Sequence, residues 1–334
     1  MTLDCKLPLV GLGTCYRGFD RKNPDRALKG HRGSLRRLFE TELAIARCEF
    51  ERLKGYYEEL DMRDPIYLAG VTNSVVGALG RGDLRLFERI LKDLHGYAEM
   101  NPNPYAKLGR EITEAWIRQF LWVRKGYPEW MSRINLTAIP EEWKRQCAYL
   151  GVKGMLCRKN YDTAYASATM LLNFDSRRDA LAAFPVYERL VCAIACHELG
   201  RKEEAFFWFR QTVEQTCPHG IILPYLLLAA RLGPLMEDVI LEVSPEAVAK
   251  VRRLAPTFFR NVIRFHNRFT GENLTTALLP REFYLAEQLC DGYSYKEIAE
   301  KLNVSLGRVN NVVSRIYKKL GVHGKEQLRK CVAN

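Results

Sequence analysis

Residues Leu278–Val322, LLPREFYLAEQLCDGYSYKEIAEKLNVSLGRVNNVVSRIYKKLGV, decide the fold of this chain. They contain helical patterns separated by residues that begin or end helices. Pro280 suits the first position of a helix, where its missing N–H needs no partner, and Asp291-Gly292 ends that helix. Ser294 begins a second helix, because its hydroxyl and the carboxylate of Glu297 can each satisfy a free amide in a capping box.

A third helix comes after a short turn. Asn303-Val304 supplies the turn, and Ser305 can cap a helix that runs to about Leu320. A short helix, a turn and a longer helix in this order make a helix-turn-helix unit. The sequence therefore predicts such a unit near its C-terminal end.

The third helix has two different faces. With residues placed at roughly 100° intervals, Val313, Ile316 and Leu320 fall within about 40° of Val309, so this side faces the core of the domain. The opposite side has amides, a hydroxyl and cations but no carboxylate: Asn311, Ser314 and Lys318, flanked by Asn310, Arg308 and Arg315. Such a face suits a groove lined by phosphates and base edges.

The last part of the sequence is strongly basic. Residues 308–334 contain seven Lys or Arg and one acidic residue, Glu326. A solvated helix face normally mixes both signs, so the imbalance favours a polyanionic partner. The alternative is a charged, exposed helix that has no partner.

This segment resembles the DNA-binding domain of LuxR-type (GerE-like) regulators. Its opening matches the LTPRE motif of that family as Leu278-Leu279-Pro280-Arg281-Glu282. The match continues in one register through Gly292, Ser294, Lys296-Glu297-Ile298-Ala299, Leu302, Val304-Ser305, Gly307, Val309, Asn311, Ser314-Arg315-Ile316-Tyr317 and Lys319-Leu320-Gly321-Val322. So many positions in one register make the resemblance specific.

The resemblance implies how the domain would bind DNA. In such regulators the third helix enters the major groove, and a fourth helix, here roughly Gly324 to Val332, pairs two copies of the domain. Carried over position by position, the base contacts fall on Asn310, Asn311 and Ser314. The phosphate contacts fall on Lys296, Arg308, Arg315, Lys318 and Lys319.

Three positions depart from the family pattern. Leu279 stands where Thr is usual, Asn310 where Lys is usual and Val312 where His is usual. Losing the hydroxyl at residue 279 weakens a helix cap by roughly 1 kcal/mol. Losing the lysine at residue 310 removes a phosphate or guanine contact, but Asn can pair with adenine N6 and N7, worth roughly 1–3 kcal/mol of discrimination. We therefore expect an altered sequence preference rather than lost binding.

Length and composition fit a globular protein of about two domains. The chain has 334 residues, 47% of them hydrophobic, with a formal net charge of +12 that indicates affinity for polyanions. A second basic stretch, nine Lys or Arg against three Asp in residues 1–37, has no clear periodicity. We interpret residues 1–35 as a solvated, partly flexible end, with an auxiliary phosphate contact as the alternative.

Helix after helix precedes the helix-turn-helix, and a short pattern recurs among them. It ends in an apolar residue five positions after its start, and it occurs at Cys48–Leu53, Gly82–Phe87, Gly126–Met131, Lys159–Ala164 and Gly200–Ala205. Each copy comes after an apolar helical pattern and opens an amphipathic one. The starts are 34, 44, 33 and 41 residues apart, which is the length of a helix pair with its loops.

Stacked helix pairs can bury faces that two helices alone cannot. Residues 36–269 therefore resemble a degenerate tetratricopeptide-type (TPR-like) solenoid, as in the MalT-like branch of LuxR regulators, where such repeats precede the same C-terminal domain. The alternative is a non-repeating helical domain. Near the end we expect a hairpin of Leu223–Leu241 and Pro245–Leu254, a further helix over Pro256–Phe269, a linker at 270–277 and the DNA-binding domain at 278–334. The expected fold class is all-α.

The common catalytic and metal motifs are missing from the sequence. It has no G-x-x-x-x-G-K-[ST] phosphate loop, so the ATPase module of the MalT-like regulators is not expected. Cys192, Cys196 and His197 come closest to a metal site, but a second ligand pair is absent and the cysteines also suit a buried helix face. We therefore expect no enzyme, no cofactor and no metal. Scattered thiols and the shortness of the most apolar interval, Ile221–Ala230, favour a cytoplasmic protein.

The helical region is the expected input of a regulator. Its concave surface is the natural place for a small ligand or a partner helix. Aromatic side chains that could wall such a site lie within 28 residues: Trp116, Trp122, Tyr127, Trp130 and Trp143. The same residues also suit the core of the repeats, and no ligand can be assigned from them.

Together these features predict a cytoplasmic transcription regulator whose helical-repeat region senses a ligand or partner and controls a C-terminal helix-turn-helix. The expected partners are double-stranded DNA, a second copy of the chain on DNA and, by resemblance, RNA polymerase, since the resemblance implies activation rather than repression. No membrane is expected to take part. The alternative is a helical-repeat scaffold that binds proteins and does not bind specific DNA.

Overall fold

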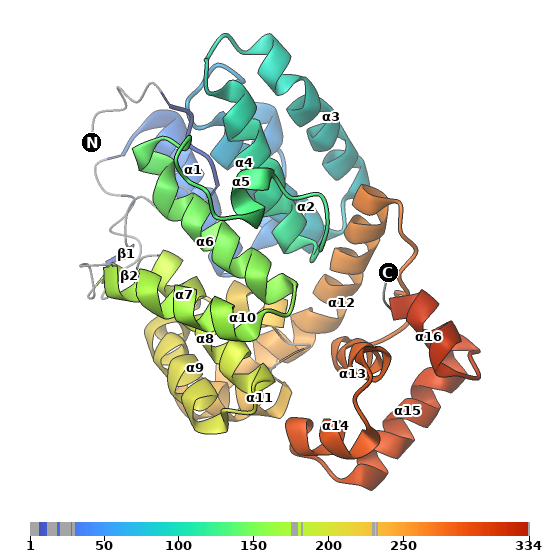
Figure 1. Ribbon diagram of the computed structural model, residues 1–334. Helices are drawn as coiled ribbons and strands as arrows, with labels where there is room; N and C mark the ends of the chain where they lie inside the picture. The colour runs from blue at the N-terminus through green and yellow to red at the C-terminus, as the bar shows by residue number, and fades with distance from the viewer. Residues whose placement is uncertain are drawn as a thin grey trace.

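The computed structural model describes residues 7–11, 19–20, 28, 31–174, 180–181, 183–228, 231 and 233–332, and nearly all of the regular secondary structure in them is helical (Figure 1). A large helical region, residues 33–270, precedes a smaller C-terminal domain that lies beside α12 (Figure 1). The elements of the helical region are α1 (Gly33–Ala46), the 3-10 helices η3 (Phe50–Leu53) and η4 (Tyr56–Glu59), α2 (Tyr67–Arg81), α3 (Leu84–Met100), α4 (Ala106–Phe120), α5 (Glu129–Ser132), α6 (Glu141–Cys157), α7 (Tyr161–Phe174), α8 (Ala183–Glu198), α9 (Lys202–Thr216), the 3-10 helix η5 (Cys217–His219), α10 (Leu223–Leu228), α11 (Gly233–Val243) and α12 (Pro245–Thr270).

The C-terminal domain contains the predicted helices, α13 (Pro280–Asp291), α14 (Tyr295–Leu302), α15 (Leu306–Leu320) and α16 (Lys325–Val332). The hydroxyl of Ser294 accepts the backbone N–H of Glu297 at 3.2 Å, and the Glu297 carboxylate accepts the Ser294 N–H at 2.7 Å. This confirms the predicted capping box. Ser305 caps α15 by accepting the backbone N–H of Arg308 at 3.2 Å.

The start of α13 is capped from one side only. The carboxylate of Glu282 accepts the backbone N–H of Leu279 at 2.9 Å, but the Leu279 side chain has no oxygen with which to accept a bond in return. The helix still begins at Pro280 and ends before Gly292, whose φ of 105° is the left-handed conformation that ends many helices. Losing one cap at residue 279 therefore does not prevent the helix.

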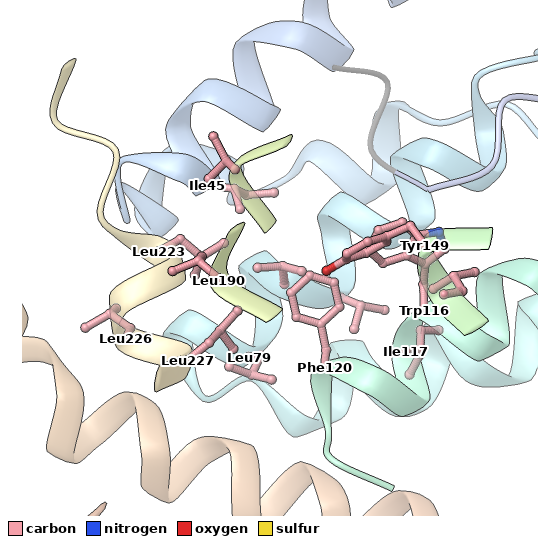
Figure 2. Packing of buried hydrophobic residues seen from close by; sticks show 14 of the residues in the cluster. Ile45, Leu79, Trp116, Ile117, Phe120, Tyr149, Leu190, Leu223, Leu226 and Leu227 are labelled. Carbon is pink, nitrogen blue, oxygen red and sulfur yellow. The ribbon is translucent and has the colours of Figure 1, made fainter. Parts of the chain in front are cut away.

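One large apolar core joins the helices of the helical region, from α1 to α12. Figure 2 shows part of it, with residues of α10 on one side and residues of α4 on the other: Leu223, Leu226 and Leu227 against Trp116, Ile117 and Phe120. Of the five clustered aromatic residues, Trp116 and Trp143 are fully buried. These two are core residues, as one of the two interpretations of the sequence holds.

The recurring sequence pattern marks the turns between helices. Each of its five copies starts at a residue with positive φ: Cys48 (57°), Gly82 (74°), Gly126 (72°), Lys159 (65°) and Gly200 (77°). A residue in this left-handed conformation typically stops a helix, and Gly adopts it most easily because it has no Cβ. The self-similarity of the sequence thus reflects repeated helix endings.

The copies differ in the element that comes after the turn. Three of them open the long helices α3, α7 and α9, as expected. The other two do not, because the first opens only the 3-10 helices η3 and η4 and the third precedes α5, which has four residues. The expectation of an amphipathic helix after every copy is wrong at these two places. The repeat solenoid as a whole stays a prediction.

The end of the helical region differs from the sequence prediction in two ways. The helices expected at Pro245–Leu254 and Pro256–Phe269 are one continuous helix of 26 residues, α12, with Pro256 inside it. Pro256 has no N–H for the carbonyl four residues earlier, but burial of Phe258 in one apolar core and of Phe259 in the other holds the helix through this position. The pattern at Leu223–Leu241 is also two helices, α10 and α11.

Residues 7–11 of the N-terminal segment are packed against the helical region. Leu7 and Val10 are buried, and the carbonyl of Pro8 accepts the indole N–H of Trp143 at 3.2 Å. The expectation of a solvated end is therefore wrong for these residues. Two-residue strands β1 (Phe19–Asp20) and β2 (Ala180–Leu181) pair antiparallel. The basic residues through Lys29 that could have touched phosphate lie outside the described residues.

The two cysteines of the candidate metal group lie in the apolar interior between packed helices. Cys192 and Cys196 are fully buried on α8, which packs between α7 and α9. Within the described ranges, no group of three or more potential metal ligands comes together. None of the helices in that part of the chain combines the length and the apolar character needed to cross a bilayer.

Candidate nucleic-acid interface

Helix α15 presents an apolar face inward and a polar face outward. Val309, Val313 and Ile316 are buried in the core of the C-terminal domain, and Leu320 packs against it. Figure 1 shows α15 on the side of this domain that is turned away from α12. The assignment of the core-facing side from sequence is confirmed. The other side of the helix is left open to solvent.

All of the side chains predicted to contact DNA are exposed: Asn310, Asn311, Ser314, Lys296, Arg308, Arg315, Lys318 and Lys319. Seven of them lie on α15 and therefore share one ridge, while Lys296 lies near the start of α14. In the described part of the chain, no carboxylate pairs with Lys296, Arg308 or Lys318. These cations are available to an outside anion.

Two of the predicted phosphate contacts already have an internal partner. The carboxylate of Glu282 on α13 accepts from Arg315 Nε at 3.1 Å and from Lys319 Nζ at 2.7 Å. Burial disfavours the ionised form of Glu282, but Lys319, the Leu279 N–H and Arg315 outweigh this and lower its pKa. Glu282 therefore stays ionised and fixes the direction of both cations while they remain on the surface.

Sequence reasoning missed this role of Glu282. Its position three residues after Leu279 indicates a capping residue, and the carboxylate does cap α13. Nothing in the local pattern links it to Arg315, which lies 33 residues later. Only the packing of α15 across α13 brings the three charges together.

The geometry is that of a helix-turn-helix with an open recognition helix. Residues 276–332 match the family described as bacterial regulatory proteins, luxR family. The C-terminal domain is a LuxR-type helix-turn-helix domain. Such a domain implies DNA binding and transcriptional regulation, and its family is one of regulators rather than of catalysts. The match ends at this domain, and the helical region before it is all-α without an assigned type.

Neither a curated protein nor a solved structure matches the chain. The helical region contacts the LuxR-type domain directly. These contacts involve α13 and α14, and they leave the ridge of α15 uncovered (Figure 1).

Glu198, at the end of α8, is the centre of these contacts. Its buried carboxylate accepts from the hydroxyl of Tyr284 at 2.7 Å and from the ammonium of Lys301, both in the LuxR-type domain. Arg231 of the helical region lies 3.7 Å from the same carboxylate. Burial opposes ionisation of Glu198, but Arg231 and Lys301 outweigh it and lower its pKa. The two parts of the chain thus share one buried charge cluster.

Further ion pairs surround this cluster. Each joins one side chain of the helical region to one of α13: Arg124 to Glu287 at 2.7 Å, Glu237 to Arg281 at 2.6 Å, and Lys159 to Asp291. In addition, Lys202 donates to the carbonyl of Glu300 on α14 at 3.3 Å. Several polar contacts at once fix the orientation of the LuxR-type domain more closely than any one of them could.

The apolar core of the LuxR-type domain also extends beyond its own helices. Phe259 and Ile263 of α12 belong to this core, and the ring of Phe259 lies 5.4 Å from that of Phe283 on α13. On its other side, Phe259 contacts Trp122, whose ring centre is 5.6 Å away. A movement of α12 would therefore change the packing of the core of the LuxR-type domain.

Proposed function

We propose that this protein is a sequence-specific, DNA-binding transcription regulator in which the helical region controls the LuxR-type domain. The observation that supports it most is the ridge of α15, which offers amides, a hydroxyl and cations without an opposing carboxylate at its centre. Amides read base edges and cations bind phosphates, so one helix combines both kinds of contact that specific recognition needs.

Each predicted residue has a role in this proposal. Base contacts come from Asn310, Asn311 and Ser314 in the major groove. Phosphate contacts come from Lys296, Arg308, Arg315, Lys318 and Lys319. Because Arg315 and Lys319 are held by Glu282, they serve as fixed contacts, whereas the other three cations can adjust to the backbone of the duplex.

The helical region acts as the input. It is a TPR-like array of the MalT-like kind, and an effector bound to it would change how it holds α13 and α14. The buried cluster around Glu198 and the shared core at Phe259 are the physical links through which such a change can pass. By its resemblance to LuxR regulators, the protein binds DNA as a dimer through α16 and activates transcription by contacting RNA polymerase.

Selection of bound genomic fragments, followed by sequencing, tests this proposal. We expect a preferred sequence made of half-sites whose centres are about 10 bp apart, or a multiple of that distance, because a two-fold dimer places its recognition helices one helical turn apart. Binding should weaken steeply between about 50 and about 200 mM salt. A protein-binding scaffold would show neither a preferred fragment nor this salt dependence, and that outcome would overturn the proposal.

A further inference from the structure

A cavity of about 420 Å³ lies where the helical region meets the LuxR-type domain. Its walls come from α4 and the loop after it, from α6, α8, α10 and α12, and from the LuxR-type domain itself through Phe283, Glu287 and Val332. The volume is within the range of pockets that bind metabolites. A molecule held in it would touch both parts of the chain at once.

Most of the cavity wall is apolar. Leu156, Leu190, Leu227, Ile263, Phe269 and Phe283 all line it. Figure 2 shows two of these wall residues, Leu190 and Leu227, on the α10 side of the core, across from Tyr149, which also lines the cavity. Such a wall favours a ligand whose body is a hydrocarbon chain or an aromatic ring.

Three cations on the wall have no carboxylate partner among the described residues: Lys125, which is exposed, and the half-buried Arg118 and Lys153. Arg118 lies 4.9 Å above the ring of Phe269 and donates only to the carbonyl of Lys125, at 3.4 Å. Lys153 lies 5.2 Å above the ring of Phe120. Burial lowers the pKa of Lys153, because it disfavours the charged ammonium. The nearby Cys157 raises this pKa, but by less than burial lowers it. A bound anion would remove this penalty.

Apart from the exposed Lys125, the other charges of the cavity already have partners among the described residues. Arg124 is paired with Glu287 and Arg231 with Glu198. His266 bonds to Glu272 at 2.7 Å through Nε2 and to the carbonyl of Leu121 at 2.6 Å through Nδ1. Arg118 and Lys153 are therefore the half-buried cations that a negatively charged ligand could pair with.

We propose that this cavity binds a small organic carboxylate, with its apolar body against Leu190, Leu227 and Phe283 and its carboxylate at Lys153 and Arg118. The planar guanidinium and the ammonium both donate to carboxylate oxygens. Glu272 and Glu287 also face the cavity, and their charges disfavour a doubly charged group such as a phosphate monoester. This assignment rests on the proposed function, in which the helical region senses an effector. Binding of the ligand can nevertheless be measured without DNA.

The position of the cavity gives the ligand a physical route to the DNA-binding domain. It touches Phe283 and Glu287 on α13 and Val332 on α16, so it fits only when the LuxR-type domain is docked as observed. A ligand that binds one arrangement better than another shifts the population toward that arrangement. The carboxylate therefore stabilises the docked state and the position of α16, the expected dimer helix.

Calorimetric titration of the full chain tests this site with matched probes: octanoate and 4-phenylbutyrate as carboxylates, 1-octanol as the uncharged analogue and octyl phosphate as the dianion. We expect at least one carboxylate to bind, and 1-octanol and octyl phosphate to bind about tenfold or more weakly, because a hydrogen bond between charged groups contributes that much. The variants Lys153→Met and Arg118→Leu should each lose about tenfold in affinity for the carboxylate. Lys144→Met, on the same helix as Lys153 but paired with Glu141 at the surface, is the control and should bind like the wild type.

Binding by neither carboxylate, equal binding of 1-octanol, tighter binding of octyl phosphate, or unchanged affinity in both cavity variants would overturn this assignment. Thermal unfolding of Lys153→Met shows whether the variant folds, and replacing a half-buried cation that has no carboxylate partner by Met should not lower its midpoint. The two proposals can fail separately. If the protein selects DNA sequences but binds no carboxylate, only the cavity assignment is wrong. If it binds a carboxylate but selects no DNA sequence, only the proposed function as a regulator is wrong.

Discussion

The LuxR-type domain has two charged faces that differ in the partners of their charges. On the outer ridge of α15, Arg308 and Lys318 face solvent without a carboxylate beside them among the described residues. On the face formed by α13 and α14, Lys301, Glu287 and Asp291 are all paired with the helical region. Similar residue types thus have different surroundings on the two faces of one small domain. The inner face is used for docking, and the outer face is the one that we propose binds DNA.

Removing Glu198 should produce the largest effect, on the docking face. Glu198→Ala leaves Lys301 and Arg231 without their buried carboxylate and Tyr284 without its acceptor. Breaking a buried ion pair from one side typically destabilises by about 3–5 kcal/mol. We expect a loss of about 3 kcal/mol in the free energy of unfolding, measured by chemical denaturation of the full chain.

Glu203→Ala is the matched control for this experiment. Glu203 lies on α9, close in sequence to Glu198, but its side chain is exposed. Its replacement should change the free energy of unfolding by less than about 0.5 kcal/mol, as surface substitutions usually do. Equal stability of the two variants would show that the Glu198 cluster does not hold the domains together.

The two faces also differ in how well the sequence predicts them. The caps at Ser294 and Ser305 and the buried side of α15 can be predicted from local patterns, because capping and helical periodicity depend on residues within a few positions of one another. The contact of Glu198 with Lys301 joins residues 103 positions apart. No local pattern encodes such a pairing, so the docking face could not be predicted.

The same limit explains the errors in the helical region. The turns at Gly82 and Lys159 are visible as repeated helix ends, because a left-handed turn has a local signal. A different local rule, that proline lacks the N–H needed inside a helix, predicts a break at Pro256, and there the packing of α12 against two cores prevails. The cavity has no sequence signal at all, since its walls come from segments between Arg118 and Val332.

On the outer face, Asn311 tests base recognition. Asn311→Ala removes an amide that can donate and accept at one base edge, while every predicted phosphate contact remains. We expect the ratio of specific to nonspecific affinity to fall by an amount equivalent to about 1–3 kcal/mol. Competition binding between the selected site and a scrambled site at one salt concentration measures this ratio. Equal loss on both sequences would mean that Asn311 supports the fold or binds the backbone instead.

The smallest effect is expected for replacement of Lys318. This variant distinguishes a charge that binds DNA from a charge that holds the two parts of the chain together. Lys318 is exposed on α15 and pairs with no carboxylate in the described part of the chain, so Lys318→Ala should leave stability unchanged and remove about one phosphate contact. The slope of log K against log salt concentration should become less negative by about 0.9. Lys107→Ala, an exposed position on α4 far from α15 in the sequence, carries the same charge change and should leave the slope as it is. If both variants flattened the slope alike, the salt dependence would reflect the net charge of the protein, and the outer face would lose its distinction from the rest of the surface.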